Sequence, residues 1–236
     1  MIQSTLIDSV PGIRHVFGSF TDPSPDLLTP DFWKKNNPTW KQVHGNRVCA
    51  VPSPNYPCGD ADGMWTQEPL TPLGVITADC VPILLTHSSG KQIAALHAGW
   101  RGSLNKIIGK FAEQHSFTHQ EWGSWFAALG PAIGPCCFEV QETLVETFCQ
   151  TFPHFPRALI NPRHRHLDLW EINRLQLNQI GVHQVEILRQ CTRCSLDSDT
   201  PRFFSHRRCP GEGRQLSMIV ADPFLKGNLR KTMVPF

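Results

Sequence analysis

Two histidines and one cysteine, His44, Cys80 and His97, are the residues of this chain best suited to chemistry. Each lies in a short and unusual stretch, namely QVHG at 42–45, TADC at 77–80 and HAGWRG at 97–102. Two imidazoles and one thiolate can hold a zinc ion and leave its fourth position open, as catalytic zinc sites do. Such a site requires that the three side chains meet in space.

The stretch between the cysteine and the second of these histidines predicts a β-hairpin. Two apolar, β-prone runs, 81–86 and 92–96, flank a turn in which Gly90 supplies a positive φ. If Ser89 and Gly90 are the two loop residues, the numbers of paired positions sum to 179. One residue more or less in the loop would turn one partner to the other face.

This register predicts how Cys80 and His97 are placed. Pro82 lies opposite His97, and Cys80 lies opposite Gly99. Cys80 then falls diagonally across from His97, at roughly 7–8 Å between Cα atoms, so both side chains can reach one ion. His44 is remote in sequence, and nothing local brings it to the hairpin.

The composition is that of an ordinary soluble globular protein of 236 residues, and we expect one domain over 1–236. A net charge of +2 argues against nucleic-acid or membrane-surface binding. The apolar runs are too short for a transmembrane span, and the first residues do not resemble a signal peptide. Nine cysteines, an odd number without the spacing of a secreted scaffold, indicate reduced thiols and a cytoplasmic protein.

The order of elements predicts an α+β fold, a layered α/β arrangement in which helices flank a mixed, largely antiparallel sheet. Strands are expected at 13–17, 47–51, 74–77, 81–86, 92–97, 125–129, 185–188, 202–205 and 216–220. Three helices are expected, at 104–115 with Ser103 as its N-cap, at 139–148, and from Asp168 to Gly181.

Arg101 and two glycines precede the first of these expected helices. A helix N-terminus favours an anion, and the planar guanidinium suits phosphate or carboxylate. The segment 99–103 is therefore a candidate seat for a phosphate group. The alternative is a tight strand-to-helix turn with an exposed arginine.

Other clusters of polar or sulfur-bearing residues allow more than one interpretation. The segment 205–208, with Ser205 and His206, is expected to line a pocket, although a basic sheet edge is the alternative. Asp62 lies in a turn, from which its carboxylate can orient a ligand histidine. The basic run 163–166 is expected to be a solvated loop.

The remaining cysteines include one close pair, Cys191 and Cys194. This pair can join Cys136 and Cys137, or Cys209, in a four-thiolate zinc site. Adjacent cysteines are poor geometry for such a site, and reduced structural thiols are the expectation.

Eight segments together resemble one family, known as multicopper polyphenol oxidase or laccase-like, to which purine nucleoside phosphorylase and adenosine deaminase activities have been assigned. The segments are QVHG (42–45), ADG (61–63), TADCVPILL (77–85), AALHAGWRG (94–102), LGPAIGPCCFEV (129–140), LDL with an Asn at 173 (167–173), CTRC (191–194) and FFSHRR (203–208). They cover roughly residues 40–220 in the family's order.

The resemblance implies a single α/β domain whose metal is held by His44, Cys80 and His97. It implies zinc, with copper as an alternative, and a monomer or homodimer that acts on a nucleoside and phosphate. The implied reactions are phosphorolysis of adenosine, inosine and methylthioadenosine and deamination of adenosine. It also links some bacterial members to the editing of peptidoglycan precursors.

One segment departs from the family's pattern. Members carry a segment like F-S-T-R-x-G-G near the N-terminus, whose arginine is a natural phosphate contact, whereas this chain has FGSFTDP at 17–23, followed by a shortened loop. Either Arg14, Arg47 or Arg101 replaces the missing charge, or phosphate handling is weakened.

A metal ion at the three ligands lowers the pKa of its water, which supplies a nucleophile for C6 of adenine. Phosphorolysis needs an anion beneath C1′ of the ribose, and Arg101 fits that role by position. Asp62 and Asp79 are the candidate acid or base. We expect the three ligands and Arg101 to be catalytic, and Arg101, Asp62, Ser205 and His206 to bind substrate.

Three other functions remain open. Cys80 and His97 can form the nucleophile and base of a cysteine hydrolase or amidase. Three nitrogen and sulfur ligands can bind copper, although a multicopper oxidase needs more clustered histidines. A non-catalytic, metal-dependent interaction module is the third.

Overall fold

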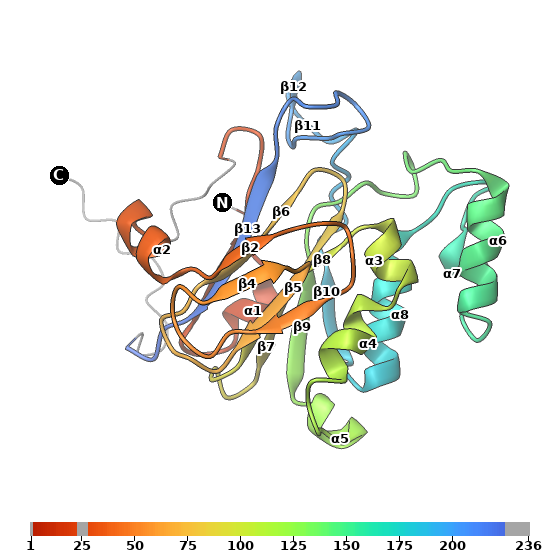
Figure 1. The fold of residues 1–236 in the computed structure, drawn as a ribbon. Coiled ribbons are helices and arrows are strands. Elements are labelled where there is room, and N and C mark those ends of the chain that lie inside the picture. Colours follow the sequence, from red (N-terminus) through yellow and green to blue (C-terminus); the bar gives the residue numbers. More distant parts are fainter. Residues whose placement is uncertain (1, 23–27, 225–236) are drawn as a thin grey trace.

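The computed structural model describes residues 2–22 and 28–224, which are built around a six-stranded sheet (Figure 1). In spatial order its strands are β10 (Gln184–Ile187), β9 (Trp125–Leu129), β7 (Val81–His87), β8 (Ile93–Ala98), β5 (Gly63–Thr66) and β3 (Val48–Ala50). The two outer pairs are parallel and the three inner pairs antiparallel. The sheet is therefore mixed and largely antiparallel, as the sequence predicts.

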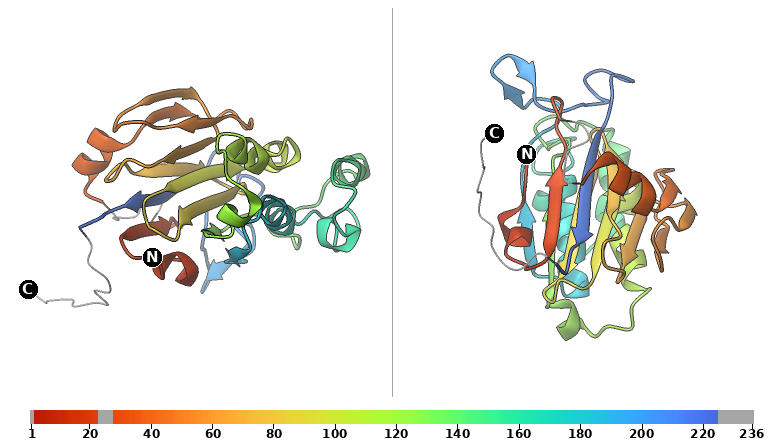
Figure 2. Two further views of the ribbon diagram at one scale, coloured as in Figure 1. Left: turned by 90° about the horizontal axis from the view of Figure 1, so that it is seen from below. Right: turned by 90° about the vertical axis from the view of Figure 1, so that its left-hand side faces the viewer.

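A second sheet and three helices cover the two faces of this sheet (Figures 1 and 2). The second sheet has the order β1 (Ile13–Phe17), β13 (Gln215–Ala221), β6 (Leu73–Thr77), and the helices are α3 (Trp100–Leu104), α4 (Ile107–Ala112) and α8 (Leu169–Ile180). Along β7, Ile83 and Leu85 pack in the core on the helix side, whereas Leu84 packs with the second sheet. Because both faces are buried, the strand is a continuous apolar run.

The remaining elements of the described residues are five helices and four short strands. The helices are α1 (Thr5–Asp8), α2 (Pro30–Asn36), α5 (His119–Trp122), α6 (Glu142–Thr151) and α7 (Arg157–Ile160). The strands form two small pairs, β2 (Thr39–Lys41) with β4 (Pro57–Asp60) and β11 (Leu196–Asp197) with β12 (Thr200–Pro201). Among the described residues no helix has the length and apolar character needed to cross a membrane.

The hairpin of β7 and β8 has the predicted register, with Pro82 opposite His97. His87 donates its N–H to the carbonyl of Gln92, and Gly90, at φ +68°, donates to the carbonyl of His87. The loop between the last paired residues is therefore longer than two residues. The loop contains the same number of additional residues on the β7 side as on the β8 side. The pairing of Pro82 with His97 is therefore the predicted one.

The expected helix over 104–115 is wrong in its start and its continuity. α3 already begins at Trp100, and Lys106, at φ +57°, separates it from α4. Ser103 does not cap a helix, because it is buried inside α3 and its hydroxyl accepts a hydrogen bond from Nδ2 of Asn173 at 2.8 Å. The serine thus ties α3 to α8, and the helix begins inside the segment 99–103, at Trp100, and not after it.

The prediction for α8 is confirmed. The carboxylate of Asp168 accepts the N–H of Glu171 at 3.1 Å, and Gly181 ends the helix at φ +105°. The expected helix over 139–148 is displaced, because α6 begins at Glu142.

The segment 202–205 is not a strand, contrary to expectation. Its backbone is paired by a side chain instead, since Oε1 of the buried Gln215 accepts the N–H of Phe204 at 2.9 Å. Nε2 of the same glutamine lies 3.4 Å from the carbonyl oxygen of Phe204. The extended, β-prone sequence therefore has a partner without forming a sheet.

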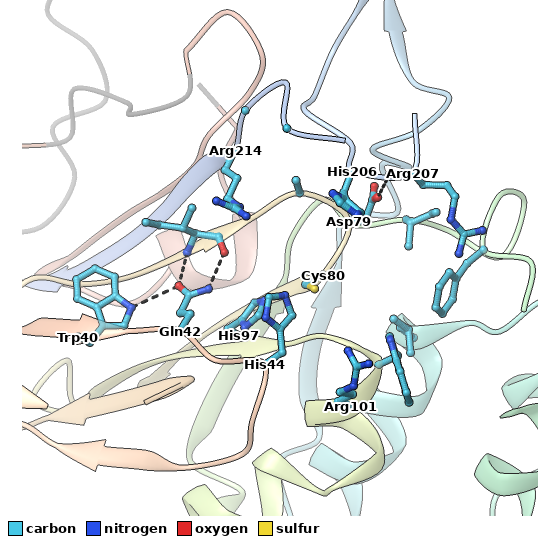
Figure 3. A pocket seen from close by; sticks show the side chains of 18 residues that line it. Trp40, Gln42, His44, Asp79, Cys80, His97, Arg101, His206, Arg207 and Arg214 are labelled. Carbon is cyan, nitrogen blue, oxygen red and sulfur yellow. Dashed lines mark hydrogen bonds between the residues drawn. The ribbon is translucent and has the colours of Figure 1, made fainter. Parts of the chain in front are cut away.

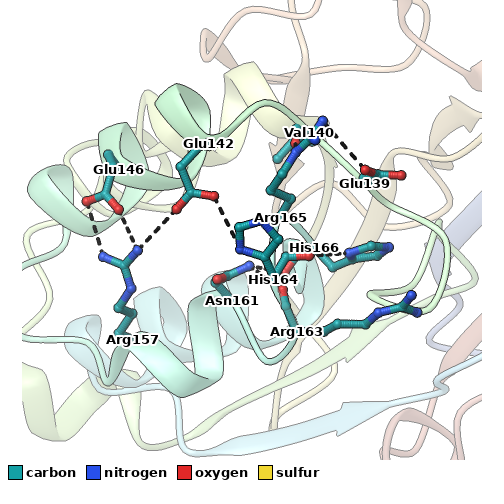
Figure 4. A network of polar contacts seen from close by, with 10 residues as sticks. All are labelled: Glu139, Val140, Glu142, Glu146, Arg157, Asn161, Arg163, His164, Arg165 and His166. Carbon is teal, nitrogen blue, oxygen red and sulfur yellow. Dashed lines mark hydrogen bonds and ion pairs between the residues drawn. The ribbon is translucent and has the colours of Figure 1, made fainter.

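The basic run 163–166, expected to be a solvated loop, is partly packed (Figure 4). Arg165 accepts the N–H of Val140 through its carbonyl oxygen and donates from Nε to the carbonyl of Val140. His164 is 81% exposed, but His166 is only 8% exposed. The run thus fixes the segment that follows Phe138.

Burial of His15 on β1 predicts a stability change with pH. Its Nε2 accepts the N–H of Ser4 at 2.7 Å, and burial lowers its pKa to about 4 against the opposing charge of Glu186. The unfolded chain therefore binds the proton more tightly. The stability that neutral His15 gives is complete above about pH 6.5 and is lost as the pH falls through about 4, by about 3 kcal/mol in all.

Chemical unfolding measured at steps from neutral pH to pH 4 checks this expectation. The His15→Gln protein keeps a side-chain acceptor but cannot titrate, so its free energy of unfolding should fall less steeply with decreasing pH. Equal slopes in the two proteins would contradict the assignment.

Candidate functional site

The structure brings His44, Cys80 and His97 together, with one ligand atom of each within 4.8 Å of the others. His97 lies near the end of β8, Cys80 directly precedes β7, and His44 lies in the loop between β2 and β3 (Figure 3). The two imidazole rings are edge-to-face, with their centroids 4.9 Å apart. The three residues therefore meet in space, as a metal site requires.

Two glycines permit this close approach. A Cβ on Gly99 would lie 2.8 Å from Sγ of Cys80 and 3.7 Å from Cδ2 of His44. A Cβ on Gly102 would lie 3.0 Å from the carbonyl oxygen of Gly45. The glycines of HAGWRG thus let α3 and the loop of His44 close around the thiol.

One buried carboxylate organises both histidines. Asp62 is 1% exposed and accepts the backbone N–H groups of Val43, His44 and Gly45 at 3.2, 2.9 and 2.8 Å. Its Oδ1 also lies 2.8 Å from Nδ1 of His97. A carboxylate at this contact accepts, so Nδ1 of His97 carries the proton and Nε2 is left to bind a metal. The same bonds hold His44 at φ +59°, a conformation that non-glycine residues rarely adopt.

Electrostatics favour a thiolate in this cluster. Burial raises the pKa of Cys80, but hydrogen bonds from His44 and His97 more than offset it and lower the pKa to about 7. Burial lowers the pKa of His97, and hydrogen bonds with Asp62 and Cys80 raise it to about 9. Two nitrogens, a thiolate and an orienting carboxylate fit a zinc ion with three protein ligands and an open fourth position.

The cluster lies in the wall of a cavity of about 1000 Å³. The wall combines positively charged and aromatic side chains, among them Arg101, Arg207, Arg214, Trp40, Trp100 and Phe138. Figure 3 shows Arg101 on one side of Cys80 and Arg214 on the other. A flat, apolar group carrying or accompanied by an anion would match this wall.

Of the four residues expected to bind substrate, two line the cavity and two do not. Arg101 and His206 line the cavity, and the guanidinium of Arg101 stacks 4.3 Å from the ring centroid of Trp100. Ser205 is 1% exposed and accepts the N–H of Arg208, so it lies behind the wall. Asp62 acts on the ligand histidines and does not line the cavity.

Only one of the three arginines that were expected to replace the missing family arginine lies in this wall. Arg101 does, whereas Arg47 donates from Nη1 to the carbonyls of Cys58 and Asp60. Arg14 lines a separate cavity of about 330 Å³. Part of the departing segment, and of the loop expected to be shortened after it, lies at 23–27, outside the described residues.

Sequence reasoning missed several residues of the wall. Gln42 belongs to the motif QVHG, and its side chain pairs with the backbone N–H and carbonyl of Ile76, at 2.7 Å each. Arg214 lies directly before β13 and follows Gly211 and Gly213. These two glycines are the sequence feature that could have pointed to this residue. Asp79, by contrast, is one of the two candidate acids or bases from the sequence, and it does line the cavity. At φ +90°, it accepts the hydroxyl of Thr192 at 2.6 Å and the N–H of Arg207 at 2.7 Å.

The fold and the cluster define a class, layered α+β proteins with a two-histidine, one-cysteine metal-binding cluster at the rim of a cavity. Residues 31–222 match the family model described as multi-copper polyphenol oxidoreductase laccase, and the chain belongs to this family.

Relatives of this chain carry the name of one activity. Purine nucleoside phosphorylase YfiH of Escherichia coli (strain K12) is 33% identical over 186 residues, which cover 78% of this chain and 74% of that protein. Purine nucleoside phosphorylase YlmD of Geobacillus stearothermophilus is 37% identical over 195 residues, covering 76% and 70%. The crystal structure of YlmD from that organism superposes with a TM-score of 0.69 at 31% identity, covering 80% of this chain and 74% of that one. Bacillus licheniformis hypothetical protein YfiH gives a TM-score of 0.71 at 26% identity, covering 84% and 78%.

Proposed function

We propose that this protein is a zinc-dependent purine nucleoside phosphorylase that acts on adenosine, inosine and methylthioadenosine and also deaminates adenosine. The observation that carries the proposal is the joint position of His44, Cys80, His97 and Arg101 in one cavity wall. The names of the relatives support the nucleoside as substrate.

Arg101 is the residue we assign to phosphate. It lines the cavity, and no residue of the described chain forms an ion pair with it in the structure. Its guanidinium presents a planar fork of donors that matches two phosphate oxygens. Arg214 on the opposite side of the cluster supplies a second positive charge.

The departing purine needs an apolar surface and a proton. Trp40, Trp100 and Phe138 supply aromatic wall for a flat base. Asp79 holds the hydroxyl of Thr192 and the N–H of Arg207 with its two carboxylate oxygens, and we assign proton exchange with the purine to His206 in the same wall. A zinc ion, when bound by the three ligands, would supply Lewis acidity and an open coordination position.

Zinc fits this chain better than multicopper chemistry. Among the described residues only two groups of three or more side chains are arranged to hold a metal, and one of these contains cysteines alone. The other contains two histidines, which is fewer than a set of clustered copper ions would need. The proposal therefore assigns one zinc ion to His44, Cys80 and His97.

Product analysis of inosine with the zinc-loaded protein tests the proposal. Hypoxanthine and ribose 1-phosphate should form only when phosphate is present, and adenosine should yield inosine without it. Arg101→Ala should raise the KM for phosphate roughly 10- to 100-fold, because one charge-assisted contact is lost. Arg47→Ala is the matched control, since Arg47 does not line the cavity. Full zinc occupancy without base release would reject the phosphorylase assignment.

A cysteine hydrolase is the second candidate, and one observation favours it. Cys80, His97 and Asp62 lie in the order of nucleophile, base and orienting acid, and the pKa of Cys80 is lowered to about 7. His44 argues against this alternative, because a second imidazole beside the thiol has no place in such a triad but completes a metal site.

A further inference from the structure

Four cysteines from two separate loops meet at a second place in the molecule. Cys136 and Cys137 follow β9, Cys191 and Cys194 follow β10, and their Sγ atoms all lie within 4.8 Å of one another. The sulfur atoms of Cys136 and Cys194 are 3.7 Å apart. Cys209, the other expected partner, is not part of this group.

A tight turn brings the two adjacent cysteines into reach. The carbonyl of Gly134 accepts the N–H groups of both Cys137 and Phe138 at 2.9 Å. A bridge between Ala132 and Cys191 holds this turn beside the second loop. Adjacent cysteines are therefore compatible with this group, because the turn and the bridge present both of them to the pair at 191 and 194.

In the loop that carries Cys191 and Cys194, backbone N–H groups surround the sulfur of Cys191, an arrangement typical of metal-binding cysteine loops. The N–H of Gly134 donates to Sγ of Cys191 at 3.3 Å. Burial raises the pKa of Cys191, but backbone N–H groups of Gly134, Cys194 and Arg193 more than offset it and lower the pKa. The thiolate is the form that binds a metal, and a Cys-x-x-Cys loop is a usual source of two zinc ligands.

Burial is the largest cause that raises the pKa of two other thiols of the group, Cys136 and Cys194. Burial and then Cys191, together with the other sulfurs, raise the pKa of Cys136. Burial and the thiols of Cys191 and Cys137 raise the pKa of Cys194 to about 11, against an opposing hydrogen bond with Cys136. A divalent ion at the centre would favour the thiolate form of all four cysteines, because its charge stabilises every thiolate that binds it.

We propose that Cys136, Cys137, Cys191 and Cys194 bind a second zinc ion in a closed, four-thiolate site. Four protein ligands leave no position for substrate, so the site is structural. It rests on this group alone and does not depend on the proposed activity.

The position of the group defines its role. Thr192, between two of the ligands, donates its hydroxyl to Asp79, and Ile133, shortly before Cys136, donates its N–H to the carbonyl of Asp79. Asp79 is the residue directly before Cys80, and Ile133 lines the cavity. The second zinc would therefore fasten the two loops that support the wall beside the first metal centre.

Zinc content per chain tests the proposal. Protein produced with added zinc and purified with reductant and no chelator should contain two zinc ions, and Cys194→Ser and Cys80→Ala should each contain one. Cys209→Ser, which changes an exposed thiol outside the group, is the matched control and should contain two. Wild-type content in Cys194→Ser, or one zinc in the wild type that only Cys80→Ala removes, would overturn the proposal.

X-ray absorption of the zinc left in Cys80→Ala requires no change in the cysteine group itself. Four sulfur neighbours at about 2.3 Å are expected. Nitrogen or oxygen neighbours would overturn the proposal. A wild-type protein purified under nitrogen whose mass is lower by two hydrogens, with Cys136 and Cys194 joined on peptide mapping, would assign the group to a disulfide instead.

Discussion

Cys80→Ala is expected to abolish metal binding at the His44–Cys80–His97 centre and to lower kcat/KM roughly a thousandfold. The substitution removes the thiolate, which is the charged ligand of the three, and with it the metal ion. The Lewis acidity of that ion lowers the activation free energy by several kcal/mol. Metal content and phosphate-dependent base release, measured on the same preparation, check this expectation.

The metal content also separates the two candidate functions. Cys80→Asp replaces the thiolate by a carboxylate that can bind zinc but cannot act as a sulfur nucleophile, so it should retain part of both metal and activity. Cys149→Ser, a change in α6 away from the centre, should leave both unchanged. Cys80→Ala protein that keeps this zinc in full but has no turnover would instead support the cysteine hydrolase.

Asp62→Asn is expected to weaken zinc binding roughly 10- to 100-fold, the usual effect of losing an orienting carboxylate. Three backbone N–H groups, from Val43, His44 and Gly45, face this carboxylate, and an amide NH₂ would oppose one of them. His44 would lose its fixed position, and His97 would lose a negatively charged partner at Nδ1.

Competition with a chelator of known affinity measures this effect. Asp60→Asn is the matched control, because the contact of Asp60 with Arg47 uses its backbone carbonyl and not its carboxylate. Equal zinc affinity in Asp62→Asn and the wild type would show that the carboxylate does not support the metal ligands.

The part of the site that local sequence could predict is the hairpin. Two apolar runs and a central turn define the pairing of Pro82 with His97, and the two-residue period then places Cys80 on the same face. His44 could not be placed in this way. Its link to His97 passes through Asp62, and a carboxylate that accepts four hydrogen bonds from two remote segments leaves no periodic signal in the sequence.

The errors elsewhere have related causes. Ser103 has the residue type of a helix cap, but its hydroxyl is used in a contact with α8. Phe204 has the residue type of a strand, but Gln215 pairs with its backbone through a side chain. Adjacent Cys136 and Cys137 have an unfavourable spacing for a metal site, but the turn at Gly134 decides where they lie. In each case a long-range contact or a local turn overrides a residue preference.

A crystal of the protein with inosine analogue and phosphate, measured at the zinc absorption edge, tests the central claim most directly. The account predicts an anomalous peak bonded to His44, Cys80 and His97, with phosphate on Arg101 and the purine against the aromatic wall. A nucleoside bound away from this cavity, or no metal between the three side chains in zinc-saturated protein, would contradict it.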